Sequence, residues 1–182
     1  MEKTKWVVDP MHSELGFKIK HLMISNVSGV FKDFKIEMET DAEDFSTAHI
    51  QLTAAINSVD TKNAQRDGHL LTSDFFEADK YPELKFVSTS VKPIGGDDYT
   101  VWGNLTMKGV TLPVELKVEY SGVTKDPWGG ERAGFTVEGK IRRTEFGLTF
   151  NSILDSGGVG LGEDVRILAE LQLVKQAVSV AA

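Results

Sequence analysis

The chain has no cysteine and 4 histidines, so its candidate nucleophiles, acids and bases are serines, histidines and carboxylates. Ser13, Asp67 and His69 could form a serine-nucleophile triad, but no nucleophile elbow surrounds the serine and no segment indicates an oxyanion hole. The 4 histidines have neither HxH nor HExxH spacing, so they do not indicate a metal site. We therefore predict no catalytic residue, no metal and no cofactor.

The segment from residue 63 to 82 concentrates unusual side chains: an Arg-Asp pair, a histidine, two leucines and two adjacent phenylalanines. It interrupts an apolar–polar alternation that runs through most of the sequence, which predicts a short helical insert near residues 61–80. Thr61 and Ser73 are the predicted N-caps of its two turns. A helical insert in an all-β chain needs an apolar surface to pack on, and the open end of a barrel supplies one.

Two roles for the insert are open from its residues. Its predicted apolar underside, which would act either as a moving lid or as a fixed plug, consists of Leu70, Phe75 and Phe76. Arg66 could bind a phosphate or carboxylate head group through its planar set of donors, and His69 could add a donor when protonated. Alternatively, Arg66 and Asp67 hold the end of the barrel through structural hydrogen bonds.

The remaining alternation has the two-residue period of half-buried β-strands. It predicts about eight strands, joined in sequence by hairpin signals such as Lys108-Gly109. No strand–helix–strand alternation is present, so the strands are expected to be antiparallel. We therefore predict an all-β fold, an antiparallel eight-stranded barrel whose closure removes exposed strand edges. It forms a single domain over residues 1–182, with a core of about 4–174 and a glycine-rich loop at 155–162.

One face of the predicted strands is apolar and points into the barrel. An eight-stranded barrel is just wide enough to be filled by side chains or to hold one small ligand. Small residues on this face favour a cavity, namely Ala48, Ala54, Gly103, Ala133, Gly139 and Ala169. A filled core explains the same pattern equally well. The predicted lining of a cavity is Phe17, Ile19, Phe34, Ile36, Leu52, Ile56, Phe86, Val101, Leu105, Leu116, Val118, Phe135, Val137 and Ile167.

Composition narrows the classes of partner. A net charge of -7 and a pI near 5.1 argue against a nucleic-acid-binding protein. The absence of cysteine excludes disulfides and thiolate chemistry. No window approaches the roughly 18 apolar residues of a membrane span, so no integral membrane segment is expected. The N-terminal residues lack the apolar core of a signal peptide, which predicts a cytoplasmic protein, or a periplasmic one if the chain was trimmed.

An ordered set of motifs resembles the bacterial YceI-like family, and it extends from about residue 4 to residue 173. The N-terminal part of this set is His12-Ser13-x-Leu15-x-Phe17-x-Ile19-Lys20-His21, Gly29-x-Phe31 and Ser58-x-x-Thr61. The insert and the strand after it contribute Arg66-Asp67-x-His69-Leu70, Asp74-Phe75-Phe76, Tyr81-Pro82 and Phe86. The C-terminal part is Gly103-x-Leu105-Thr106-x-x-Gly109-Val110-Thr111-x-Pro113-Val114 and Arg143-x-Glu145-Phe146-Gly147-Leu148. Leu112 and Arg142 depart from the usual pattern of the family.

The resemblance implies a lipocalin-like barrel with a long apolar channel that binds a polyisoprenoid or a similar long-chain amphiphile. The function expected on this basis is a non-catalytic carrier, with the lipid tail in the channel. Candidate residues for its head group or the barrel rim are His12, Ser13, His21, Arg66, Asp67, His69 and Arg143. An enzyme acting on a small apolar substrate inside the barrel and a protein–protein module are the alternatives. The sequence leaves open whether the barrel forms a homodimer.

Overall fold

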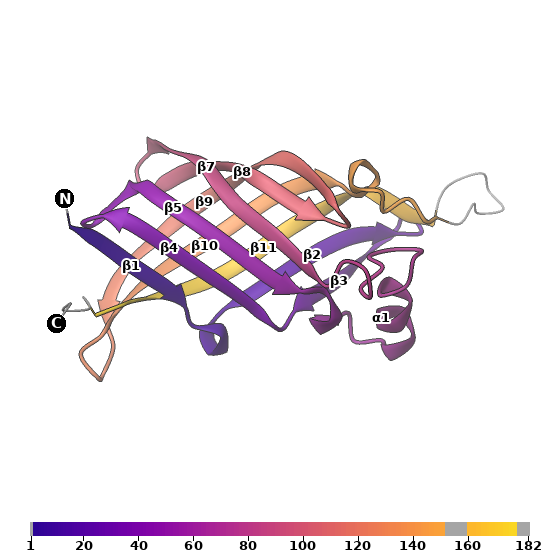
Figure 1. Ribbon diagram of the computed structural model, residues 1–182, viewed down its shortest axis with the longest axis horizontal. Helices are drawn as coiled ribbons and strands as arrows, with labels where there is room; N and C mark the ends of the chain where they lie inside the picture. The colour runs from indigo at the N-terminus through magenta and orange to yellow at the C-terminus, as the bar shows by residue number, and fades with distance from the viewer. Residues whose placement is uncertain (1, 152–159, 178–182) are drawn as a thin grey trace.

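The computed structural model describes residues 2–151 and 160–177 (Figure 1). Most of the glycine-rich loop predicted at 155–162 therefore lies outside the described residues. The strands are β1 (Lys3–Val8), β2 (Glu14–His21), β3 (Ser25–Phe31), β4 (Phe34–Asp41), β5 (Asp44–Ala55), β6 (Val59–Asp60), β7 (Glu83–Gly95), β8 (Asp98–Met107), β9 (Val110–Lys125), β10 (Glu131–Arg142) and β11 (Leu161–Lys175). The helical segments are α1 (Ala64–Leu70) and the 3-10 turns η1 (Pro10–His12), η2 (Ile56–Ser58) and η3 (Arg143–Phe146).

Eight of these strands close into an antiparallel barrel, which confirms the predicted fold. Their order is β1-β4-β5-β7-β8-β9-β10-β11, and β11 pairs again with β1 to complete the circle. Strand β11 pairs with two strands along one edge: β2 pairs with its first part and β1 with its last residues. Its other edge pairs with β10. Strands β3 and β6 extend the sheet beyond β2. The described barrel strands therefore form a closed ring, which removes the unpaired edges of an open sheet.

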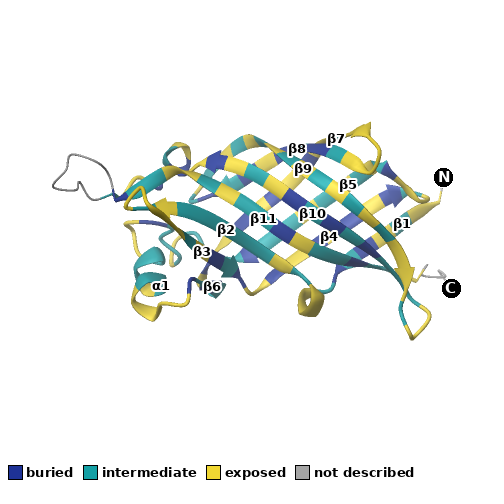
Figure 2. Ribbon diagram, turned by 180° about the vertical axis from the view of Figure 1, so that it is seen from behind, coloured by how far each residue is buried: buried dark blue, intermediate teal, exposed yellow. Residues whose placement is uncertain are grey.

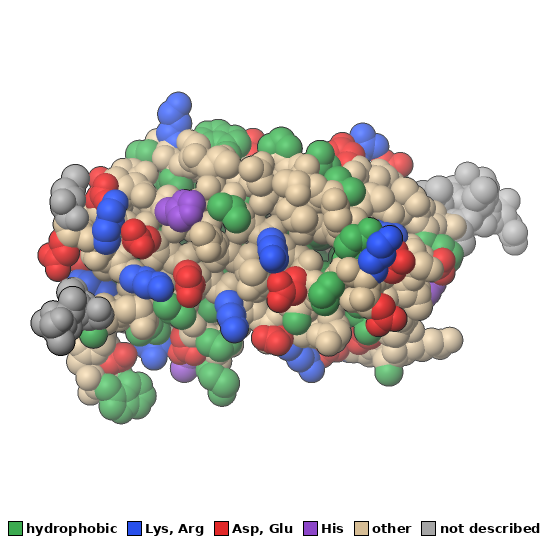
Figure 3. Space-filling view, viewed as in Figure 1, with side chains coloured by type: hydrophobic (Ala, Val, Ile, Leu, Met, Phe, Trp, Pro, Cys, Tyr) green, Lys and Arg blue, Asp and Glu red, His purple; other side chains and the backbone are tan. Residues whose placement is uncertain are grey.

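Burial alternates along the barrel strands as the sequence pattern predicts (Figure 2). In β4, Phe34, Ile36 and Met38 are buried, whereas Lys35 and Glu37 between them are exposed. On the visible outer face, acidic and basic side chains are interspersed and no large area carries one sign of charge (Figure 3). The charge pattern is that of a solvated outer face, so the apolar chemistry of the barrel is concentrated inside it.

The barrel has two different ends, which Figure 1 shows at the right and the left. We call the end with α1, the β2–β3 turn and the β8–β9 turn the mouth end. We call the end with both chain termini and the β9–β10 turn at 126–130 the floor end. The β8–β9 turn is the predicted tight hairpin: Lys108 and Gly109 have φ angles of 49° and 75°, as a two-residue left-handed turn requires.

The predicted insert is present, but its caps differ from the prediction. Asn63 is the N-cap of α1, and its side chain accepts a hydrogen bond from the backbone N–H of Arg66 at 2.9 Å. Thr61 does not cap the helix, because its hydroxyl is engaged by the side chains of Arg66 and Asp67. Ser73 caps no helix either, since the chain continues after α1 as a series of turns.

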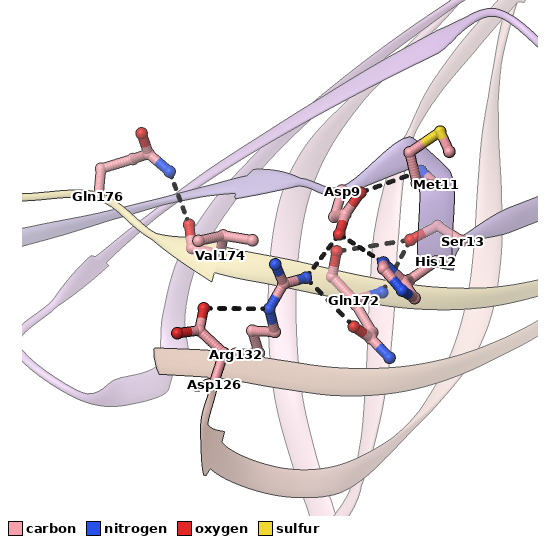
Figure 4. A network of polar contacts seen from close by, with 9 residues as sticks. All are labelled: Asp9, Met11, His12, Ser13, Asp126, Arg132, Gln172, Val174 and Gln176. Atoms are coloured by element: carbon pink, nitrogen blue, oxygen red, sulfur yellow. Dashed lines mark hydrogen bonds and ion pairs between the residues drawn. The ribbon is translucent and has the colours of Figure 1, made fainter. Parts of the chain in front are cut away.

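Polar contacts around Asp9 fix the junction between β1 and β2 (Figure 4). The Asp9 carboxylate accepts hydrogen bonds from Arg132 Nη1 at 2.5 Å and from His12 Nδ1 at 2.7 Å. Arg132 Nε also donates to Asp126 at 3.3 Å. Ser13 Oγ accepts from the backbone N–H of Gln172 on β11 at 2.9 Å. These contacts tie the β1–β2 junction to β10 and β11.

Candidate functional site

The barrel encloses a cavity of about 450 Å³ whose wall is almost entirely apolar. Most of the predicted lining residues lie on this wall: Phe17, Ile19, Ile36, Leu52, Phe86, Val101, Leu105, Leu116, Val118, Phe135, Val137 and Ile167. Cavities of a few hundred Å³ are typical of sites for small molecules and cofactors. A solidly filled core is therefore not the state of this barrel.

Phe34 and Ile56 are corrections to the predicted lining. Both are buried, at 6% and 1% exposure, but neither contributes to the cavity wall. Phe34 begins β4 and Ile56 begins the η2 turn, so both lie at the ends of their strands. Alternation assigns a side chain to the inner face but does not give its depth along the barrel axis, which explains the difference.

The small residues of the inner face do not create the cavity in the expected way. Of the six, Ala169 alone lies on the wall. A Cβ atom at Gly103 would stand 2.4 Å from the ring of Phe86, and one at Gly139 would stand 2.6 Å from Leu116. These two glycines therefore make room for large neighbouring side chains.

Aromatic side chains pack at the floor end of the cavity. The ring of Phe45 lies 4.9 Å from that of Tyr120, 5.4 Å from that of Phe135 and 5.7 Å from that of Trp6, centroid to centroid. Phe45 and Phe135 also line the cavity. Burial raises the pKa of Tyr120, which keeps its phenol neutral. The floor is thus an uncharged surface suited to the end of an apolar tail.

Most of the polar side chains on the wall lie at the mouth end, and four of them are basic residues. His21, Arg66, His69 and Arg143 line the cavity there, together with Thr61. No Asp or Glu lies on the described part of the wall. The cavity thus has an apolar interior and a rim of hydrogen-bond donors. This arrangement fits an amphiphile whose tail lies inside and whose oxygen-bearing head lies at the mouth.

Arg143 is the most deeply buried of these donors, at 3% exposure. Its Nε donates to the carbonyl oxygen of Gly162 at 2.8 Å, and its Nη1 donates to those of Leu148 and Phe150 at 2.6 and 3.0 Å. Among residues 2–151 and 160–177, its Nη2 has no hydrogen-bond partner. Removal from water lowers the pKa of Arg143, although a guanidinium remains charged in proteins. One donor group of a buried cation is therefore left over at the mouth.

Arg66 and Asp67 both hold Thr61. Arg66 Nε donates to Thr61 Oγ1 and its Nη2 to the Thr61 carbonyl oxygen, each at 2.7 Å. Asp67 Oδ1 accepts from the Thr61 backbone N–H at 2.9 Å and from its hydroxyl at 2.5 Å. Asp67 lies off the cavity wall and has a structural role in holding Thr61. Arg66 combines this structural role with a place on the wall.

The imagined catalytic triad is not assembled. His69 Nε2 lies 2.7 Å from Asp74 Oδ2, and its ring packs edge-on against Phe75 and Phe150. Asp67 is bonded to Thr61 and Ser13 to Gln172, as described above. His12 and Ser13 belong to the β1–β2 junction and lie off the cavity wall.

Two general features of the described residues bear on the kind of site. Within residues 2–151 and 160–177, no group of three or more His, Asp or Glu side chains could hold a metal ion. Over the same residues, no helix is long and apolar enough to cross a membrane.

Three apolar side chains of the insert face the cavity. Leu70, Phe75 and Phe76 all contribute to the cavity wall, and Phe76 packs against the ring of Phe31 on β3 at 6.1 Å. The insert therefore covers the cavity at the mouth end.

Several wall residues are absent from the predicted lining. Phe45 and Tyr99 stand near the starts of β5 and β8, and Leu22 and Phe150 lie outside the strands. An apolar side chain in a turn breaks the alternation, and this signal could have identified Leu22.

An antiparallel eight-stranded barrel around an apolar cavity, covered at one end by a helical insert, defines a lipocalin-like protein. Residues 6–173 match the YceI-like domain, and the chain belongs to this family. It is 41% identical over 170 residues to a UPF0312 protein of Staphylococcus aureus, which covers 93% of this chain and 96% of the relative.

Solved structures share the same barrel. The Campylobacter jejuni YceI protein superposes with a TM-score of 0.76 at 34% identity, covering 87% of this chain and 90% of that one. A polyisoprenoid binding domain from Saccharophagus degradans superposes with a TM-score of 0.63 at 15% identity, covering 94% and 98%. The second likeness shows the shared fold alone.

Proposed function

We propose that this protein is a non-catalytic carrier that holds one long-chain, isoprenoid-like lipid inside the barrel. The observation that carries the proposal is the cavity itself: about 450 Å³ of apolar space with basic donors at one end. The lipid tail lies along the apolar wall, and its end reaches the aromatic floor at Phe45 and Phe135. The family membership and the polyisoprenoid binding domain with the same fold support a lipid of this chemical class.

Hydrophobic transfer supplies the binding free energy. Each methylene group moved from water into an apolar lining gains about 0.8 kcal/mol, so a long tail can bind without specific polar contacts. A carrier of this kind would keep a water-insoluble chain dispersed. Because the wall carries no directional polar groups along most of its length, we expect it to select for tail length and thickness more than for polar substituents.

The head group in this proposal lies among His21, Arg66, His69 and Arg143. Guanidinium and imidazole groups donate hydrogen bonds to the oxygen atoms of phosphates, carboxylates, phenols and carbonyls. The unpaired Nη2 of Arg143 and the location of Arg66 on the wall support this assignment. The insert residues Leu70, Phe75 and Phe76 then act as the cover over the bound lipid.

Organic extraction of the protein purified from its native host, followed by mass spectrometry, tests the proposal. We expect one long-chain lipid per protein. A Leu52→Trp variant fills the cavity from the inner face of β5 and should lose the lipid, whereas Gln51→Trp on the exposed face of the same strand should retain it. A wild-type protein that yields no lipid in its native host would contradict the carrier function.

A further inference from the structure

The turn between β2 and β3 exposes three consecutive apolar residues at the mouth end. Leu22, Met23 and Ile24 are 40%, 55% and 84% exposed. Leu22 also lies on the cavity wall, and its backbone N–H donates to the carbonyl oxygen of Gly160 at 2.7 Å. The exposed apolar surface of this turn therefore continues directly into the cavity.

The backbone of this turn has a conformation that its side chains disfavour. A hydrogen bond from the Ile24 N–H to the His21 carbonyl oxygen, at 3.3 Å, closes the turn. Its central residues, Leu22 and Met23, have φ angles of 53° and 62°. Asn-Gly is the sequence that such left-handed turns favour, and the turn at Lys108-Gly109 does place a glycine at its second position.

Folding does not explain why these positions are apolar. The left-handed conformation strains a bulky side chain, whereas asparagine or glycine adopts it readily. Burial would offset this strain, but Met23 is more than half exposed and Ile24 is almost fully exposed. An apolar surface that is both strained and solvated indicates contact with something outside the folded chain.

We propose that the Leu22–Ile24 turn inserts into the surface of a lipid bilayer and holds the mouth of the cavity against it. This inference rests on the proposed function, because a water-insoluble lipid has its reservoir in a membrane. With the turn inserted, the lipid tail passes between bilayer and cavity without crossing water. Phe150, which is 38% exposed and also lies on the wall, adds apolar surface at the same mouth.

The chemistry around the turn fits a bilayer interface. Lys20 is exposed next to the turn, where an ammonium group can meet lipid phosphates. The apolar tip is small, so its insertion is weak and reversible, as it is for a single acyl chain. A carrier needs reversible contact, because it must leave the membrane once it is loaded.

Transfer of a probe lipid from vesicles tests the inference. The probe is a pyrene-labelled long-chain alcohol in phosphatidylcholine vesicles, and uptake by lipid-free protein is followed by fluorescence. A Met23→Asn/Ile24→Ser variant removes apolar surface from the turn without altering the cavity wall, and asparagine tolerates the left-handed backbone. The matched control is Trp128→Ser, which removes an 84% exposed aromatic at the floor end.

We expect Met23→Asn/Ile24→Ser to take up the probe from vesicles at least about tenfold more slowly than the wild type. The same variant should bind probe added directly from ethanol with unchanged affinity, and its melting temperature should not fall. Trp128→Ser should take up the probe from vesicles, and bind it when it is added from ethanol, as the wild type does.

Three outcomes would overturn the inference, and they are distinguishable. Equal vesicle uptake by the wild type and Met23→Asn/Ile24→Ser would show that the turn does not dock on a bilayer. A wild-type dimer in sedimentation that the same variant dissociates would assign the turn to contact between two copies. Failure of the wild type to take up the probe by either route would instead remove the proposed function on which the inference rests.

Discussion

At the scale of single residues, Arg143 serves both the fold and the cavity. Its guanidinium binds the carbonyl oxygens of Leu148, Phe150 and Gly162, and so it holds the chain segments on both sides of residues 152–159. A buried cation is stable only when most of its donors are paired. The remaining Nη2 is the exception, and under the carrier proposal its partner is an oxygen atom of the ligand.

Replacing Arg143 with methionine should therefore lower stability strongly. The change removes the donor of three carbonyl groups, one in a buried and two in partly buried hydrogen bonds, and we expect the free energy of unfolding to fall by about 3 kcal/mol. Denaturant unfolding measures this loss. Arg142→Met is the matched control: its exposed ion pair with Glu163 should contribute less than about 1 kcal/mol. Equal effects of the two substitutions would contradict the structural role of Arg143.

Asp9 gives the protein a pH-dependent contribution to stability. Hydrogen bonds from Arg132 and His12 lower the pKa of Asp9 from 3.8 to about 2. Because the folded-state pKa lies below the unfolded value, the stabilisation is complete above about pH 5 and is lost as the pH falls from about 4 to about 2. The pKa difference limits this stabilisation to about 2 kcal/mol. Water screens the interaction further, because the Asp9 side chain is 14% exposed.

An Asp9→Asn variant should be less stable than the wild type at pH 7, and the difference should disappear near pH 2. Denaturant unfolding at several pH values measures both free energies. A difference that stays constant between pH 7 and pH 2 would show that the ionised carboxylate does not stabilise the fold.

At the scale of elements, the insert depends on a small polar network more than on helix propensity. Helix α1 has 7 residues, which is too short to be stable alone. Asn63 caps it, and Arg66 and Asp67 bind Thr61 from successive positions of the helix. These bonds orient the insert, so that its apolar underside faces the cavity.

Asp67→Ala should loosen the insert while leaving the barrel intact. The backbone N–H and hydroxyl of Thr61 lose their acceptor, and local opening should increase roughly tenfold. Hydrogen exchange of the amides from 61 to 71 measures this change. Asp79→Ala, on an exposed position of the same segment, should exchange like the wild type. Unchanged protection in Asp67→Ala would contradict the role of the Thr61 network.

The sequence predicts elements better than it predicts contacts. Two-residue alternation predicts the strands and their inner faces because it follows directly from strand geometry. The predicted N-caps Thr61 and Ser73 are wrong. Several polar residues near the start of a helix can act as its N-cap, and tertiary contacts decide among them. The extent of the cavity is also unpredictable from alternation, since Phe34 and Leu52 share one pattern but only Leu52 lies on the wall.

At the scale of the whole molecule, the barrel leaves room for a ligand. A ligand that binds the folded protein but not the unfolded chain stabilises the folded state by mass action. A lipid tail that fills the space would therefore stabilise the protein, and the protein would in turn keep the lipid dispersed.

A crystal structure of the protein purified with lipid from its native host tests the central claim most directly. We predict continuous electron density for one chain molecule inside the barrel, from the aromatic floor at Phe45 to a head group within hydrogen-bonding distance of Arg143 or Arg66. A barrel whose side chains have collapsed into the cavity, or a lipid found only on the outer surface, would contradict the account.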